Sequence, residues 1–211
     1  MEKIRVHRLY VRVFHWLNAF AMVLMISSGW RIYNASPLFG WLNFPDGLTI
    51  GGWLGGALQW HFAAMWLFVV NLAIYLVVGL VNGHFRRKML PLYPRDVIGD
   101  ITKAAQGKLP HDSHDYNAVQ KLFYLGVIAI MLLTFLSGLV VWKSVQFQAL
   151  SLIFGNYAAA RYIHFFGMSL ICAFIVVHLA LVAIVPSTLV PMITGKAKPF
   201  PKDLQEGSHV A

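Results

Sequence analysis

Charge and cysteine are both scarce in this chain of 211 residues. Charged residues make up 12 % of the sequence and hydrophobic residues 58 %, and the mean hydropathy is +0.64. A soluble domain of this size needs far more charge to cover its surface, so the composition excludes that class. The single cysteine, Cys172, excludes an internal disulfide, a cysteine-ligated iron–sulfur cluster and a covalent CxxCH haem site.

Asp, Glu, Lys and Arg are absent from four long stretches, residues 13–30, 47–85, 122–142 and 162–195. Each stretch contains the roughly 20 apolar residues that a helix needs to cross a bilayer. The sequence therefore predicts an all-α membrane protein, a four-transmembrane-helix bundle with helices near 12–33, 58–82, 120–142 and 160–185. These helices form one domain, 1–195, and a tail follows at 196–211.

The first of these helices follows a basic segment, so a cleaved signal peptide is the alternative interpretation. Its apolar run exceeds the ~7–15 residues typical of the hydrophobic part of a signal peptide. No small-x-small cleavage site follows Gly29 either. We therefore expect the segment to remain in the protein as a transmembrane helix.

Lysine and arginine gather in three segments: the N-terminus, the loop 83–119 and the tail. Only Arg31, Lys143 and Arg161 lie near the other membrane face. The positive-inside rule places the three basic segments, and with them both termini, in the cytoplasm. The net charge of +9 is then a topology signal, and we expect no nucleic-acid partner. An aromatic belt marks the opposite interface: Trp30, Trp41, Trp53, Trp60, Trp142, Tyr33, Tyr157 and Tyr162.

The apolar run "RYIHFFGMSLICAFIVVHLAL", residues 161–181, contains two histidines, His164 and His178, fourteen residues apart. Fourteen residues turn a helix through about 1,400°, so the two imidazoles share one face about 21 Å apart along the axis. One metal ion does not bridge that distance, whereas two cofactors stacked across the membrane would use it.

Two further intramembrane histidines lie at matching depths. The alternating helix directions predict an outer pair, His61 with His164, and an inner pair, His15 with His178. Imidazole suits iron, copper and zinc, while a proton relay or cation pathway normally uses carboxylates, which the spans lack. Two noncovalent b-type haems with paired axial imidazoles therefore account best for the set. The alternative is that the histidines only form hydrogen bonds between helices.

Two glycines, two arginines and one further histidine each have a functional and a structural interpretation. Gly29 and Gly138 fall at the outer depth, where a missing side chain would admit a porphyrin edge or simply allow close helix packing. Arg161 and Arg12 each lie one turn before a histidine, as partners for haem propionates or as boundary arginines that reach into the interface. His84 is interfacial, or else a ligand or quinone contact.

The fourteen-residue spacing recurs in all four helices as a weak internal repeat. The first and third helices both end in Ser-Gly followed closely by Trp. The spaced pairs are His15–Gly29, His61–Tyr75, Tyr124–Gly138 and His164–His178.

Several motifs carry a resemblance: "RVFHW" in the first helix, "QWHF" in the second and "RYIHFFG…VVHL" in the fourth. With four helices, they resemble the bacterial cytochrome b-561 and nickel–iron hydrogenase b-type cytochrome family over roughly 5–190. "YNAVQKLFY", from Tyr116, is similar to the third-helix start of formate dehydrogenase gamma subunits. The resemblance implies a membrane dihaem cytochrome b, with the four intramembrane histidines as haem ligands.

The family further implies electron exchange between a quinone pool and a redox partner. We expect a periplasmic molybdenum or hydrogenase-type oxidoreductase, docked near Arg161 and the loop 41–57. The chain would then be an electron-transfer subunit and not a complete catalyst. A stand-alone quinone-linked oxidoreductase, for example a superoxide oxidase, is the alternative. A third class is an assembly anchor or a haem or metal transporter.

Overall fold

The computed structural model describes residues 4–5, 9–83, 89–105 and 117–197. Four long helices dominate them: α1 (Leu9–Ala35), α2 (Leu54–Val81), α4 (Ala118–Trp142) and α6 (Tyr157–Ile184). Each is long and apolar enough to cross a membrane. The predicted four-helix, all-α membrane fold is confirmed, and the protein is a multi-pass membrane protein.

The remaining elements are short. The connections contain a 3₁₀ turn η1 (Asp46–Leu48), the amphipathic helix α3 (Pro94–Ala105), and α5 (Gln148–Ile153). After α6 come η3 (Pro186–Thr188) and α7 (Leu189–Thr194). The two-residue strands β1 (Ile4–Arg5) and β2 (Lys196–Ala197) pair antiparallel.

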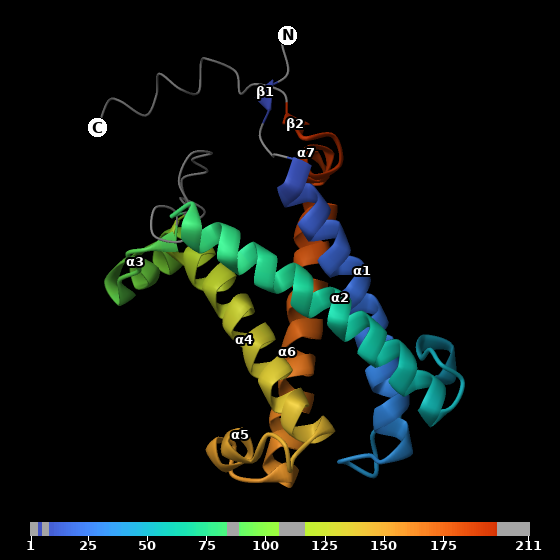
Figure 1. Ribbon diagram of the computed structural model, residues 1–211. Coiled ribbons are helices and arrows are strands. Elements are labelled where there is room, and N and C mark those ends of the chain that lie inside the picture. Colours follow the sequence, from blue (N-terminus) through green and yellow to red (C-terminus); the bar gives the residue numbers. More distant parts are fainter. Residues whose placement is uncertain (1–3, 6–8, 84–88, 106–116, 198–211) are drawn as a thin grey trace, which may run out of the picture.

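The long helices pack in two pairs, α1 with α2 and α4 with α6 (Figure 1). α1 and α4 run in the same direction, and α2 and α6 return (Figure 1). The end of the bundle that holds β1 and β2 is called the inner end below, and the opposite end the outer end. A small apolar core joins the pairs at mid-height: Ala21, Met22, Phe68, Leu72 and Ile171.

The helices begin two to four residues before their predicted starts. Polar caps explain two of these starts, because the sequence estimate followed hydrophobicity alone. The Asn117 side chain accepts a hydrogen bond from the Gln120 N–H at 2.8 Å, and the Gln120 side-chain oxygen accepts one from the Asn117 N–H. Asn156 caps α6 by accepting from the Ala159 N–H at 2.8 Å. Such caps satisfy the first N–H groups, which have no partner inside the helix.

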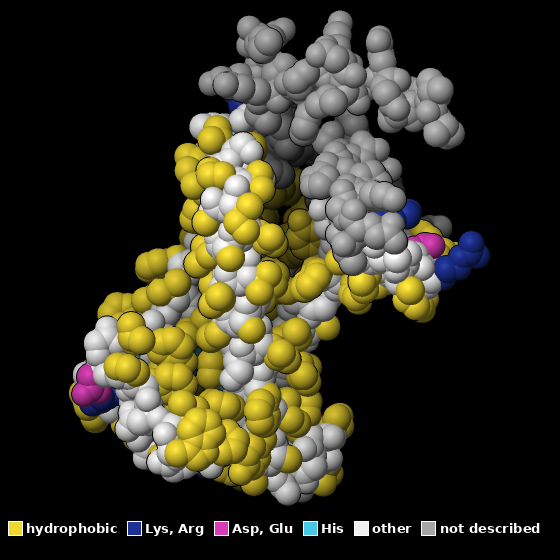
Figure 2. All heavy atoms as spheres, turned by 180° about the vertical axis from the view of Figure 1, so that it is seen from behind, with side chains coloured by type: hydrophobic (Ala, Val, Ile, Leu, Met, Phe, Trp, Pro, Cys, Tyr) yellow, Lys and Arg dark blue, Asp and Glu magenta, His cyan; other side chains and the backbone are white. Residues whose placement is uncertain are grey.

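The outer surface of the bundle is apolar. Figure 2 shows hydrophobic side chains along the helices, with charged side chains only toward the margins of that face. Few large side chains are fully buried, because lipid takes the place of a protein neighbour for most of them. Trp66, Val77, Phe123, Leu170 and Val176 are examples with more than half of their surface exposed.

The two ends of the described chain meet at the inner end. Ile4 pairs with Ala197 and Arg5 with Lys196, and the Trp16 Nε1–H donates to the Met192 carbonyl at 3.1 Å. Most of the tail predicted at 196–211, and His84, lie outside the described residues. The basic loop 83–119 contains the amphipathic helix α3.

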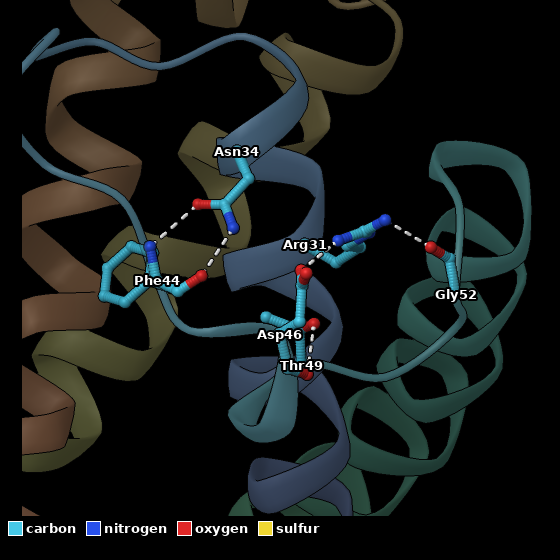
Figure 3. A network of polar contacts seen from close by, with 6 residues as sticks. All are labelled: Arg31, Asn34, Phe44, Asp46, Thr49 and Gly52. Carbon is cyan, nitrogen blue, oxygen red and sulfur yellow. Dashed lines mark hydrogen bonds and ion pairs between the residues drawn. The ribbon is translucent and has the colours of Figure 1, made fainter.

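A polar network fixes the outer loop between α1 and α2 (Figure 3). The Arg31 guanidinium donates to the Asp46 carboxylate and to the Gly52 carbonyl. The Asn34 side chain makes two bonds with the Phe44 backbone, at 2.7 and 3.0 Å. The loop is therefore held against the end of α1 by bonds to its backbone and to the Asp46 carboxylate.

Candidate functional site

The outer pair, His61 of α2 and His164 of α6, meets between the two helix pairs. Their ring centroids are 6.4 Å apart, with 66° between the ring planes. Both side chains are half-buried. The structure thus brings together the two histidines that the sequence placed at the outer depth.

The Nδ1 atom of His61 is held by α1. It lies 3.1 Å from the Met25 carbonyl and 3.1 Å from the Ser28 hydroxyl. The Ser28 hydroxyl itself donates to the Leu24 carbonyl at 2.6 Å. A carbonyl only accepts, so Nδ1 of His61 carries the proton and Nε2 keeps its lone pair.

The Nδ1 atom of His164 is held in the same way by α4. It lies 2.8 Å from the Thr134 carbonyl, so this ring also presents Nε2 with a free lone pair. Metal-ligating histidines usually donate their other N–H to such an acceptor, which fixes the tautomer and the ring orientation. Both histidines of the outer pair make such a contact through Nδ1.

The two glycines predicted at this depth lie against the imidazoles. A Cβ atom at Gly138 would come within 2.9 Å of His164 Cε1, closer than such atoms normally approach. At Gly29 it would lie 3.5 Å from His61 Cε1, an ordinary contact. Gly138 is therefore required for His164 to reach its position, and Gly29 gives His61 the same open surface.

The inner pair, His15 of α1 and His178 of α6, has ring centroids 6.1 Å apart and 71° between planes. Phe174 stacks on His178 at 5.8 Å, and Trp16 packs edge-on against His15 at 5.2 Å. The buried Asn71 of α2 donates to the Phe14 carbonyl at 3.0 Å, which fixes the turn of α1 that carries His15.

Both separations fit one metal ion between two imidazoles. A metal–imidazole bond is about 2 Å and the ring centre lies about 1 Å further back, so two opposed rings have centroids about 6 Å apart. The angle between planes does not matter, because each ring can turn about its own metal–nitrogen bond. Among the described residues, no group of three or more His, Cys, Asp or Glu side chains forms a metal cluster. The arrangement suits two separate bis-imidazole centres.

The predicted arginines lie at opposite ends of the bundle. The Arg12 Nε atom is buried without a hydrogen-bond partner, one turn from His15. An acidic group bound beside the inner pair, such as a haem propionate, would supply the missing acceptor. Arg161 instead donates to the Ser36 carbonyl at 2.5 Å and to its hydroxyl at 3.3 Å, and so closes the end of α1.

Sequence reasoning missed the groups that orient the rings. Ser28 carries a signal, because it belongs to the Ser-Gly pair of the repeat. The carbonyls of Met25 and Thr134 carry none, since every residue has a carbonyl. Asn71 is recognisable only as a polar residue in an apolar helix.

Two comparisons with known proteins agree with this arrangement. Residues 6–195 match the family model of prokaryotic cytochrome b561. The chain is also 51 % identical over 191 residues to a putative protein-methionine-sulfoxide reductase subunit YedZ1 of Azospira oryzae. The aligned residues cover 90 % of this chain and 96 % of the relative. The family consists of membrane proteins that carry b-type haem for electron transfer. The chain belongs to the prokaryotic cytochrome b561 family.

Proposed function

We propose that the chain is a dihaem membrane subunit that passes electrons between a quinone in the bilayer and a soluble redox partner. The observation that carries the proposal is the pair of imidazole pairs, with centroids 6.4 and 6.1 Å apart. Haem bound there would supply one-electron redox chemistry, with potentials set by ligation, burial and hydrogen bonding.

The four histidines have distinct roles in this proposal. His61 and His164 hold the outer haem, with their Nδ1–H groups fixed by the Met25 and Thr134 carbonyls. His15 and His178 hold the inner haem, where Arg12 offers a cation to a propionate. Gly138 and Gly29 leave room for the outer imidazoles.

The partner is a soluble oxidoreductase subunit at the outer end. The name of the relative, a putative reductase subunit, supports electron flow from the membrane toward such a partner. Trp41, Trp53 and Tyr157 are well exposed at this end, and aromatic side chains are favoured in protein interfaces. The bonds of Arg31 and Asn34 hold the loop that carries the tryptophans, so this surface is preformed (Figure 3).

The inner end faces the cytoplasm and the helices lie in the bacterial inner membrane in this proposal. Its support is the positive-inside rule, because lysines and arginines concentrate in the segments at that end. The β1–β2 pairing brings the first and the last described residues together at this end.

The test is the haem content of the purified chain. We expect two haems per chain by the pyridine haemochrome assay, with reduced b-type bands that a quinol generates. A fully reconstituted protein with one haem per chain would contradict the two-site assignment. A protein whose haems no quinol reduces would contradict the quinone part of the proposal.

A further inference from the structure

The two helix pairs correspond to each other position by position. Each residue of α4 corresponds to the residue 109 positions earlier in α1, and each residue of α6 to the residue 103 positions earlier in α2. The correspondence maps His61 on His164 and Gly29 on Gly138. It also maps the Ser28–Gly29 dipeptide on Ser137–Gly138.

The contacts within each pair follow the same correspondence. His61 Nδ1 bonds to the Met25 carbonyl, and its counterpart His164 Nδ1 bonds to the carbonyl of Thr134, the counterpart of Met25. Each of these histidines lies against the glycine four residues further along the partner helix. Four corresponding small residues are fully buried: Ser28 with Ser137, and Ala57 with Ala160.

Contacts between the pairs show that a two-fold rotation exchanges α1 with α4 and α2 with α6. Tyr33 of α1 packs on Phe165 of α6 at 5.1 Å, and the counterparts Trp142 of α4 and Phe62 of α2 pack at 4.9 Å. Because α1 and α4 run in the same direction, the axis lies along the bundle (Figure 1). The outer pair is its own counterpart and therefore sits on this axis.

The inner pair does not lie on the axis and has a counterpart of its own. The counterpart of His15 is Tyr124, and the counterpart of His178 is Tyr75. Tyr75 follows His61 by fourteen residues on α2, so it lies about 21 Å deeper, at the depth of His178. Two phenols thus occupy the positions that on the other side belong to two imidazoles.

We propose that Tyr75 and Tyr124 line a quinone headgroup site, the counterpart of the inner haem site. The inference rests on the proposed function and names the residues where quinone meets the protein. A phenol hydroxyl donates a hydrogen bond, and the two ring oxygens of a quinone accept one each. Tyr124 is 44 % exposed and Tyr75 is half-buried, so the site opens to the lipid from which a quinone arrives.

The electron balance suits this position. A quinol that becomes a quinone gives up two electrons and its two hydroxyl protons. Two haems held by the four histidines would supply two one-electron acceptors per chain for these electrons. The protons leave to water at the inner end, because Tyr75 and Tyr124 lie at that end of the bundle.

Conservative variants test the site in the haem-loaded protein. Decylubiquinone binding is titrated in detergent for wild type and for Tyr75→Phe, Tyr124→Phe and the double variant. Loss of one hydrogen bond weakens binding about fivefold and loss of both at least tenfold. The visible haem spectrum stays that of wild type. Tyr10→Phe is the matched control, since Tyr10 is an exposed phenol near the inner end of α1 whose counterpart in α4 is Val119, and this variant binds the quinone as wild type does.

The outcomes separate this inference from the function on which it rests. Wild-type affinity in the double variant, with haems that quinol still reduces, would overturn the site and leave the proposed function standing. A wild-type protein that binds no quinone would overturn both. If the tyrosines were interfacial anchors only, the double variant would keep its affinity, which is the first of these results.

A second variant tests the correspondence itself. Tyr75→His with Tyr124→His restores on this side the residues of the inner haem site, so we expect haem per chain to rise from two to three. A protein that keeps both original haem spectra but binds no third haem would contradict the counterpart relation, and the site inferred from it.

Discussion

The Nδ1 atom of His164 lies 2.8 Å from the carbonyl oxygen of Thr134, a residue of the neighbouring helix α4. This one contact fixes the tautomer, turns the ring and ties α6 to α4 at the outer depth. His61 has the same relation to Met25 of α1, at 3.1 Å. Each outer imidazole is therefore oriented by a carbonyl of its own helix pair, and the two rings face each other across the boundary between the pairs.

The pairing of the histidines predicts which variants share a phenotype. His61→Ala and His164→Ala should each remove the outer haem and leave the inner haem with its wild-type spectrum. His15→Ala should instead match His178→Ala. Low-temperature difference spectra of the four purified variants measure this. A His61→Ala spectrum that matches His178→Ala would contradict the assignment of the pairs.

The glycines predict an asymmetry between the two halves. Gly138→Ala places a Cβ atom 2.9 Å from His164 Cε1, so the ring must move, and overpacking of this kind costs about 1–3 kcal/mol. We expect a lower thermal unfolding temperature and weaker binding of the outer haem. Gly29→Ala, with its nearest contact at 3.5 Å, should change both quantities much less.

The matched control for this comparison is Gly126→Ala in the same helix as Gly138, because no atom lies within 4 Å of a Cβ added there. Unfolding is followed in detergent by loss of the haem absorbance. Equal effects of Gly138→Ala and Gly126→Ala would show that helix propensity, and not the imidazole, decides the outcome.

The proposed docking surface predicts protection from labelling. Cysteine introduced at Trp41 or Trp53 should react with a maleimide in the isolated subunit and become protected when the soluble partner binds. Cysteine at Lys103 of α3, which is exposed at the inner end, should react equally in both states. Protection at Lys103 together with unchanged labelling at Trp41 would place the partner at the inner end instead.

Much of this arrangement follows from the sequence for a simple reason. A bilayer forces each charge-free run to form its own helix, so the number of helices can be read without knowledge of packing. The histidine depths follow from alternating helix directions. The acceptor of each Nδ1–H cannot be predicted from the sequence, because it depends on which carbonyl of a neighbouring helix lies opposite the ring.

The outer loop shows the same limit. Arg31 was recognisable only as a cation at the less basic face, yet it binds Asp46 and the Gly52 carbonyl. Arg161, a candidate partner for a propionate, bonds to Ser36. Both contacts join segments whose separation in space depends on loop conformation, and hydropathy contains no information about that.

Both histidine pairs include a member of α6, since His164 and His178 are the residues that His61 and His15 meet. During synthesis α6 is the last of the four long helices to leave the ribosome. The nascent chain therefore inserts three helices before either pair can form, and it offers no bis-histidine centre while it grows. A chain that stops before α6 therefore has three of the four long helices and neither histidine pair.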